Sequence, residues 1–120
     1  MAKILVIEDD TYVRSNLLTL LEVENYECHG AENGLIGLQK VRELNPDLII
    51  CDVMMPELDG YEVLKNLRAD TKIASIPFIF LSAKADKQAI DFAMKLGAND
   101  YVTKPFTRKE LLSAIKAQIG

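Results

Sequence analysis

Ile4-Leu5-Val6-Ile7-Glu8-Asp9-Asp10 is the stretch that decides the fold, because four apolar residues in a row lead directly into three acids. A continuous apolar run, rather than an alternating one, is typical of a parallel strand covered on both faces. Similar runs occur at 48–51, 78–81 and 101–102, and a weaker, more polar run at 27–31 suits an edge strand. The sequence therefore predicts five short strands.

Between these runs the apolar residues change to helical spacing. The stripes are Val13, Leu17, Leu20, Leu21; Leu35, Leu38, Val41; Gly60, Val63, Leu64, Leu67; Ala89, Phe92, Ala93, Leu96; and Leu111, Leu112, Ile115, Ile119. We expect all of them to face the core. Residue types that cap helix N-termini stand before each stripe, namely Asp10, Asn33, Asp59, Asp86 and Thr107. Thr107 with Glu110 predicts a capping box, Gly97 a left-handed helix end, and Asn45-Pro46 the end of the second helix.

Strict alternation of strands and helices predicts an α/β fold, (βα)5, with right-handed crossovers and one parallel sheet. The doubly wound, flavodoxin-like arrangement of such a chain has strand order 2-1-3-4-5. Its ligand site lies outside the carboxyl ends of the strands, at the switch between strands one and three. At 120 residues the chain is expected to form a single domain, 1–120.

Composition excludes several classes of function. Lys plus Arg is 14 and Asp plus Glu is 18, for a net charge of −4, which opposes a non-specific nucleic-acid or anionic-membrane surface. The longest apolar run is about 76–81, far short of a membrane span, and the N-terminus does not fit a secretory signal. Cys28 and Cys51 read as reduced thiols of a cytoplasmic protein. His29 is the only histidine and has no nucleophile signature beside it, so a His-based triad is set aside.

Polar residues follow four of the five predicted strands. Glu8-Asp9-Asp10 follows the first, Asp52 the third, Ser82 the fourth and Thr103-Lys104-Pro105 the fifth. Clustered carboxylates repel one another, and a hard divalent cation such as Mg²⁺ relieves the repulsion. Glu8 and Asp9, being adjacent, suit metal binding, whereas Asp10 is adequately explained as a helix cap. Asp52 is the better nucleophile, and Lys104 and Ser82 suit a phosphoryl group, which predicts formation of an aspartyl phosphate.

These residues closely resemble the receiver domain of bacterial two-component response regulators. The resemblance covers essentially the whole chain and is carried by 4–10, 47–56, 58–60, 81–83 and 100–106. It implies that Asp52 is the phosphoacceptor, charged from a phosphohistidine of a sensor histidine kinase or phosphotransfer protein. It further implies Mg²⁺, or Mn²⁺, held by Glu8, Asp9, Asp52 and the backbone carbonyl of Met54, with Asp9 the direct ligand of the acidic pair. Ser82 and Tyr101 resemble the switch pair, Lys104 the phosphoryl-contacting lysine, and the Lys104-Pro105 bond is expected to be cis.

The resemblance implies a signalling switch rather than an enzyme, its only chemistry being its own phosphorylation and dephosphorylation. In this hypothesis Ser82 swings toward the phosphoryl group, Tyr101 moves inward, and the surface of helix four, strand five and helix five changes. An unidentified output domain or effector would read that surface, without direct nucleic-acid or membrane contact, and a homodimer through helices four and five is compatible with it. Two departures from the pattern are Glu8, where Asp is commoner, and Met54, where a polar residue is frequent.

Three other readings remain open at this point. A flavodoxin-type cofactor binder would need a hydroxyl- and Gly-rich loop after the first strand, but 8–14 has no Gly and carries three acids. A haloacid-dehalogenase-type phosphatase would need Asp-x-Asp there, and the chain has Glu8-Asp9-Asp10 and no cap insertion. A receiver-like interaction module that is never phosphorylated is disfavoured because the phosphorylation residues are all present.

Overall fold

The computed structural model describes residues 1–120, in which five strands alternate with five helices. The elements are β1 (Lys3–Ile7), α1 (Thr11–Val23), β2 (Glu27–Ala31), α2 (Gly34–Leu44), β3 (Leu48–Cys51), α3 (Gly60–Ala69), β4 (Phe78–Ser82), α4 (Lys87–Lys95), β5 (Asp100–Thr103) and α5 (Arg108–Ile119). Every neighbouring pair of strands is parallel, and the strand order is β2-β1-β3-β4-β5. The predicted fold class and strand order are therefore confirmed.

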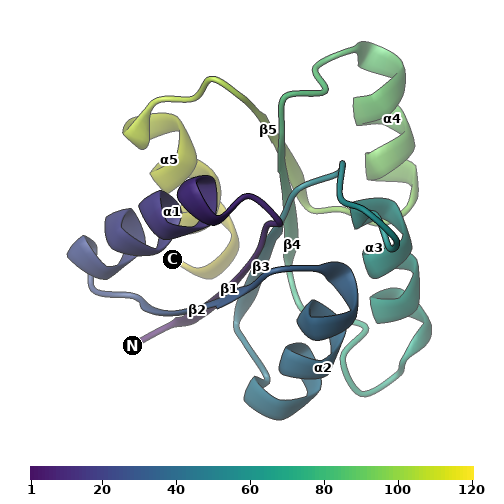
Figure 1. Ribbon diagram of the computed structural model, residues 1–120, viewed down its shortest axis with the longest axis horizontal. Helices are drawn as coiled ribbons and strands as arrows, with labels where there is room; N and C mark the ends of the chain where they lie inside the picture. The colour runs from purple at the N-terminus through teal and green to yellow at the C-terminus, as the bar shows by residue number, and fades with distance from the viewer.

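The sheet lies between two layers of helices, with α1 and α5 on one face and α2, α3 and α4 on the other (Figure 1). Alternate residues of β1 enter opposite cores: Leu5 and Ile7 pack on the side of α2 and α3, whereas Ile4 and Val6 pack on the side of α1 and α5. This two-sided burial explains why the strand sequences are continuously apolar. No helix has the length and apolar character needed to cross a membrane.

Local side-chain chemistry fixes the helix ends. All five predicted N-caps accept hydrogen bonds from backbone amides of the first helical turn, at Asp10, Asn33, Asp59, Asp86 and Thr107. The Thr107–Glu110 capping box is confirmed, and Asp59 forms a second box with Glu62 that the sequence analysis did not identify. Gly97 has the expected positive φ, and α2 ends at a left-handed Asn45.

The prediction that every residue of the apolar stripes faces the core is wrong at two positions. Leu35 is 60% exposed, because α2 packs on the sheet through its glycines instead. A Cβ at Gly37 would lie 2.6 Å from Cδ1 of Ile7, so only glycine allows this close approach. Phe92 is 46% exposed and contacts the core through the edge of Tyr61, at a ring-centroid distance of 4.9 Å.

Candidate functional site

The end of β1 and the end of β3 bring two carboxylates together. The Glu8 amide donates to the Ala31 carbonyl at 3.0 Å, and the Asp52 amide donates to the Ile7 carbonyl at 3.1 Å. These bonds extend the strand pairing by one residue, so Glu8 and Asp52 leave the sheet side by side. Asp9 follows on the exposed side, and one carboxylate oxygen from each of the three residues lies within 4.8 Å of the others.

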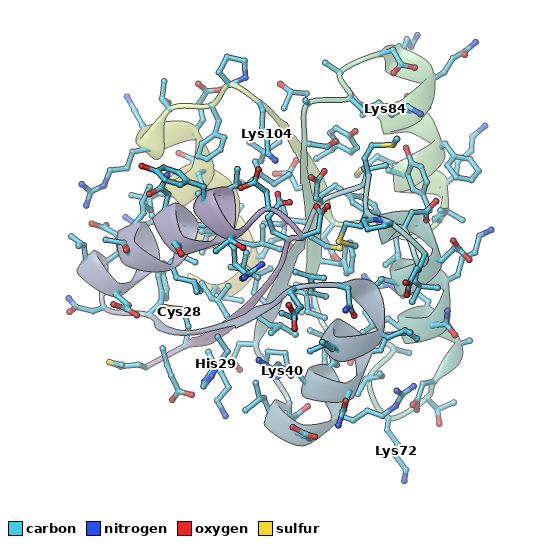
Figure 2. All side chains as sticks on the ribbon, in the orientation of Figure 1. Cys28, His29, Lys40, Lys72, Lys84 and Lys104 are labelled. Carbon is cyan, nitrogen blue, oxygen red and sulfur yellow. The ribbon has the colours of Figure 1, made fainter.

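Lys104 directly follows β5, the edge strand opposite β2, and its side chain extends to this carboxylate cluster. Its amide donates to the Ser82 carbonyl at 2.9 Å, which places its side chain at the same edge. The Nζ atom lies 3.0 Å from Oε1 of Glu8 and 3.5 Å from Oδ2 of Asp52. The Lys104–Pro105 peptide bond is cis. In Figure 2 the lysine lies between the α1–α5 layer and α4, above the centre of the molecule.

The electrostatics of the site are dominated by Glu8, which is only 3% exposed. Burial raises its pKa to about 7 from an ordinary 4.5, and the neighbouring charge of Asp52 adds to the effect. The Asp10 amide, which donates to Oε2 of Glu8 at 3.2 Å, and Lys104 both oppose this rise. Burial lowers the pKa of Lys104, but contacts with Glu8 and Asp52 outweigh it, so the pKa of the lysine is raised overall.

The donor set fits a hard divalent cation. Mg²⁺ binds oxygen ligands at about 2.1 Å, so two ligands of one ion lie at most about 4.2 Å apart. The oxygens of Glu8, Asp9 and Asp52, within 4.8 Å of one another, need only a small contraction to share one ion. The Asp52 side chain is 12% exposed and is therefore reachable from solvent. Met54, two residues later, exposes 65% of its surface beside the site.

Ser82 and Tyr101 meet through one residue of the β4–α4 loop. The Ser82 hydroxyl oxygen, in a residue that is 1% exposed, accepts from the Lys84 amide at 3.2 Å. The Tyr101 hydroxyl donates to the Lys84 carbonyl at 2.5 Å, and its ring lies 5.8 Å from that of Phe80. Burial raises the pKa of Tyr101, and the Ser82 side chain opposes the rise. The tyrosine is thus already tied to the loop in this structure.

The remaining reactive residue types lie elsewhere. Cys28 and His29, on the edge strand β2, are far from Lys104 in Figure 2. His29 instead lies 2.8 Å from Glu27 on the same strand. Cys51 is fully buried, and burial raises the pKa of both thiols. Neither cysteine is disulfide-bonded, as predicted.

Two contacts of the site are not predictable from the residue types. The Arg14 guanidinium donates to the Glu8 carbonyl at 2.7 Å, and Lys84 links Ser82 with Tyr101 through its backbone. Both contacts use backbone atoms, which every residue has, so the residue types in the sequence do not indicate which residues are in contact. Arg14 stands one turn into α1, where its helical position could have placed it near the end of β1. Asp10 is a helix cap, as predicted, and accepts from the Tyr12 and Val13 amides.

Comparison with known proteins gives one matching family model, the response regulator receiver domain, over residues 4–116. The chain is 40% identical over 117 residues to the transcriptional regulatory protein CpxR homolog of Haemophilus influenzae, covering 98% of this chain and 50% of that protein. It is 36% identical over 114 residues to the phosphate regulon transcriptional regulatory protein PhoB of Pseudomonas aeruginosa, covering 95% and 50%. The chain therefore spans about half the length of the curated relatives it matches.

Solved structures agree with this match over almost the whole chain. The Vibrio cholerae chemotaxis protein CheY4 superposes with a TM-score of 0.93 at 28% identity, covering 98% of both chains. A putative response regulator from Chloroflexus aurantiacus gives a TM-score of 0.93 at 34% identity, covering 98% of this chain and 97% of that one.

Proposed function

The chain belongs to the receiver domain family of two-component response regulators, and from this premise we propose that residues 1–120 form one receiver domain that is phosphorylated on Asp52. The donor is a phosphohistidine of a sensor histidine kinase or phosphotransfer protein. The observation that carries the proposal is the position of Lys104, whose Nζ lies 3.5 Å from Oδ2 of Asp52 and 3.0 Å from Glu8. A cation beside a solvent-reachable carboxylate is what a transferring phosphoryl group requires.

The chemical step follows from this geometry. A carboxylate oxygen of Asp52 attacks phosphorus, the phosphorus–nitrogen bond of the donor breaks, and the imidazole leaves with its electron pair. Lys104 neutralises the phosphoryl oxygens, and Glu8, Asp9, Asp52 and the Met54 carbonyl would hold Mg²⁺. The cation, when bound, supplies charge neutralisation to the same oxygens. In dephosphorylation a water molecule attacks phosphorus, the phosphorus–oxygen bond to Asp52 breaks, and inorganic phosphate leaves while the Asp52 carboxylate is regenerated. The chain's chemistry is thus confined to its own modification.

Lys84 supports a route from Asp52 to the surface. Its amide donates to Ser82 and its carbonyl accepts from Tyr101, so the two switch residues share one loop residue. If the Ser82 hydroxyl turns to the phosphoryl group, its bond to Lys84 breaks and the anchor of Tyr101 shifts. The α4, β5 and α5 surface would then change for an output domain or effector. Several relatives are named as transcriptional or DNA-binding regulators, which supports an output domain as the reader.

The test is incubation with Mg²⁺ and acetyl phosphate, followed by intact mass measurement. We expect one phosphoryl adduct on the native chain, none in Asp52→Asn and none in excess EDTA. Asp59→Asn is the matched control and should keep the adduct, because Asn replaces Asp as a helix cap with little loss. Absence of an adduct on the native chain with Mg²⁺ present would instead make this an interaction module that is not phosphorylated.

The switching route has a separate test. Amide NMR spectra of the phosphorylated and free chains should differ from Ser82 to Tyr101, and Ser82→Ala should remove most of the difference while retaining the adduct. Identical spectra in the two states would refute the route without affecting phosphorylation itself.

A further inference from the structure

The peptide group between Glu8 and Asp9 is held by a side chain of α1 and not by strand pairing. The Glu8 amide, which belongs to the preceding peptide group between Ile7 and Glu8, continues the pairing of β1 with β2 by donating to the Ala31 carbonyl at 3.0 Å. The Glu8 carbonyl, which belongs to the next peptide group, instead accepts from Nη1 of Arg14 at 2.7 Å. Arg14 makes no ion pair with any carboxylate in the structure. The Glu8 carbonyl is therefore the hydrogen-bond partner of its guanidinium group.

The fold makes room for this arginine. The Arg14 stem crosses β2 above Gly30, where an added Cβ would lie 3.1 Å from Cδ and 3.3 Å from Cγ of the arginine. Gly30 has no positive φ, so its backbone conformation does not require glycine. The side chain of Leu18 packs at the same point, also 3.1 Å from that Cβ position. The glycine therefore provides the path by which Arg14 reaches the end of β1.

We propose that Arg14 is a positioning residue for divalent-cation binding: by holding the Glu8 carbonyl it orients the Glu8–Asp9 peptide so that both carboxylates converge with Asp52. The inference rests on the proposed function, because it takes the acidic cluster to be the cation site. The orientation of this peptide plane is described by ψ of Glu8 and φ of Asp9, so it sets the direction of the Asp9 side chain relative to that of Glu8. Partners that orient metal ligands typically change metal affinity 10- to 100-fold when removed.

A positioning role and a simple charge effect predict opposite results. Arg14 is a cation close to a cation site, so by Coulomb repulsion alone its removal would strengthen Mg²⁺ binding. If Arg14 orients the ligands, its removal weakens Mg²⁺ binding despite the loss of repulsion. The sign of the change in affinity therefore separates the two accounts.

The experiment measures the Mg²⁺ dissociation constant of the unphosphorylated chain by calorimetry and by amide NMR titration. We expect Arg14→Met, which keeps the apolar stem, to raise the Kd about 10- to 100-fold. Arg14→Lys, which keeps a charged donor, should lie closer to the native chain. Leu21→Ala is the structural control: Leu21 is fully buried in the core and lies two turns from Arg14 along α1, so this variant should lower the Tm and leave the Kd unchanged.

A second variant keeps the proposal testable if Arg14→Met does not fold. Gly30→Ala retains the arginine charge but obstructs its path, so it should also raise the Kd, and adding it to Arg14→Met should cause little further loss. A Kd that is unchanged or lower in Arg14→Met overturns the inference, as does an unchanged Kd in Gly30→Ala when Arg14→Met is unfolded. A native chain that does not bind Mg²⁺ would instead overturn the metal site of the proposed function.

Discussion

Glu8 should make the metal-free protein less stable as the pH rises through neutrality. Its pKa is raised from 4.5 to about 7 by burial and by the charge of Asp52. The folded chain therefore binds a proton at Glu8 over a range in which the unfolded chain has released it. The stabilising contribution is fully present below pH 4.5 and is lost as the pH passes about 7. At about 1.4 kcal/mol per pH unit, this interval corresponds to a loss of about 3 kcal/mol.

The assay is urea unfolding followed by circular dichroism in EDTA, at several values between pH 4.5 and about pH 8. Glu8→Gln is the reference, because its amide fills the same volume and does not titrate. Glu27, whose pKa is lowered chiefly by its bond to His29, changes stability in the opposite direction near its ordinary pKa. This background is common to both proteins, so the difference between them isolates Glu8.

The result that would refute this reasoning is a constant difference in unfolding free energy between the native chain and Glu8→Gln across the pH range. That outcome would mean that Glu8 titrates alike in the folded and unfolded chains, and that its burial carries no electrostatic cost.

Three further substitutions test other parts of the structure. Lys104→Met removes a contact that lowers the pKa of Glu8, so the fall in stability should still begin near pH 4.5 but continue to a higher pH than in the native chain; an unchanged end of the fall would contradict the ion pair. Glu57 has φ of 68°, so Glu57→Gly should raise the unfolding free energy by about 1 kcal/mol, whereas Glu57→Ala should not. Arg68 donates to the backbone carbonyls of Ala74, Ile76 and Gly97 and to the side-chain oxygen of Asn99. Arg68→Met should therefore lower the free energy of unfolding by about 3 kcal/mol. A loss below about 1 kcal/mol would show that these hydrogen bonds are dispensable.

The sheet and the helix starts are predictable because their signals are local. A strand buried on both faces must be apolar at every position, which Ile4-Leu5-Val6-Ile7 makes visible. An N-cap needs a short polar side chain immediately before the helix, and all five candidates perform that role. The strand order then brings the polar side chains of the site together, because the carboxyl ends of all parallel strands lie at the same edge of the sheet. The proximity of Glu8, Asp52 and Lys104 follows from this topology.

What the sequence does not reveal depends on backbone partners and on packing distance. Arg14 binds a carbonyl, and every residue has one, so nothing in the residue types singles out Glu8. Leu35 fits the apolar spacing of α2, yet the helix lies so close to Ile7 that glycines, with Leu38 and Val41, form its buried face. Periodicity records which side of a helix is apolar, but not how near the helix approaches. The position of the Tyr101 ring likewise depends on its contact with Lys84, which spacing cannot indicate.

The site departs from the rules that explain the rest of the chain, and this departure itself bears on function. Elsewhere apolar residues fill the core and carboxylates lie at exposed caps, but Glu8 is buried beside Asp52 with a single lysine between them. Replacing this cluster with apolar residues would cost the fold little, since buried ion pairs contribute weakly to stability. An arrangement that raises the pKa of a carboxylate to about 7 is destabilising when ionised, and a divalent cation is the ligand that reverses the effect. Stability alone therefore does not account for these three side chains, whereas the proposed function, a cation bound beside a phosphoaccepting carboxylate, would account for them.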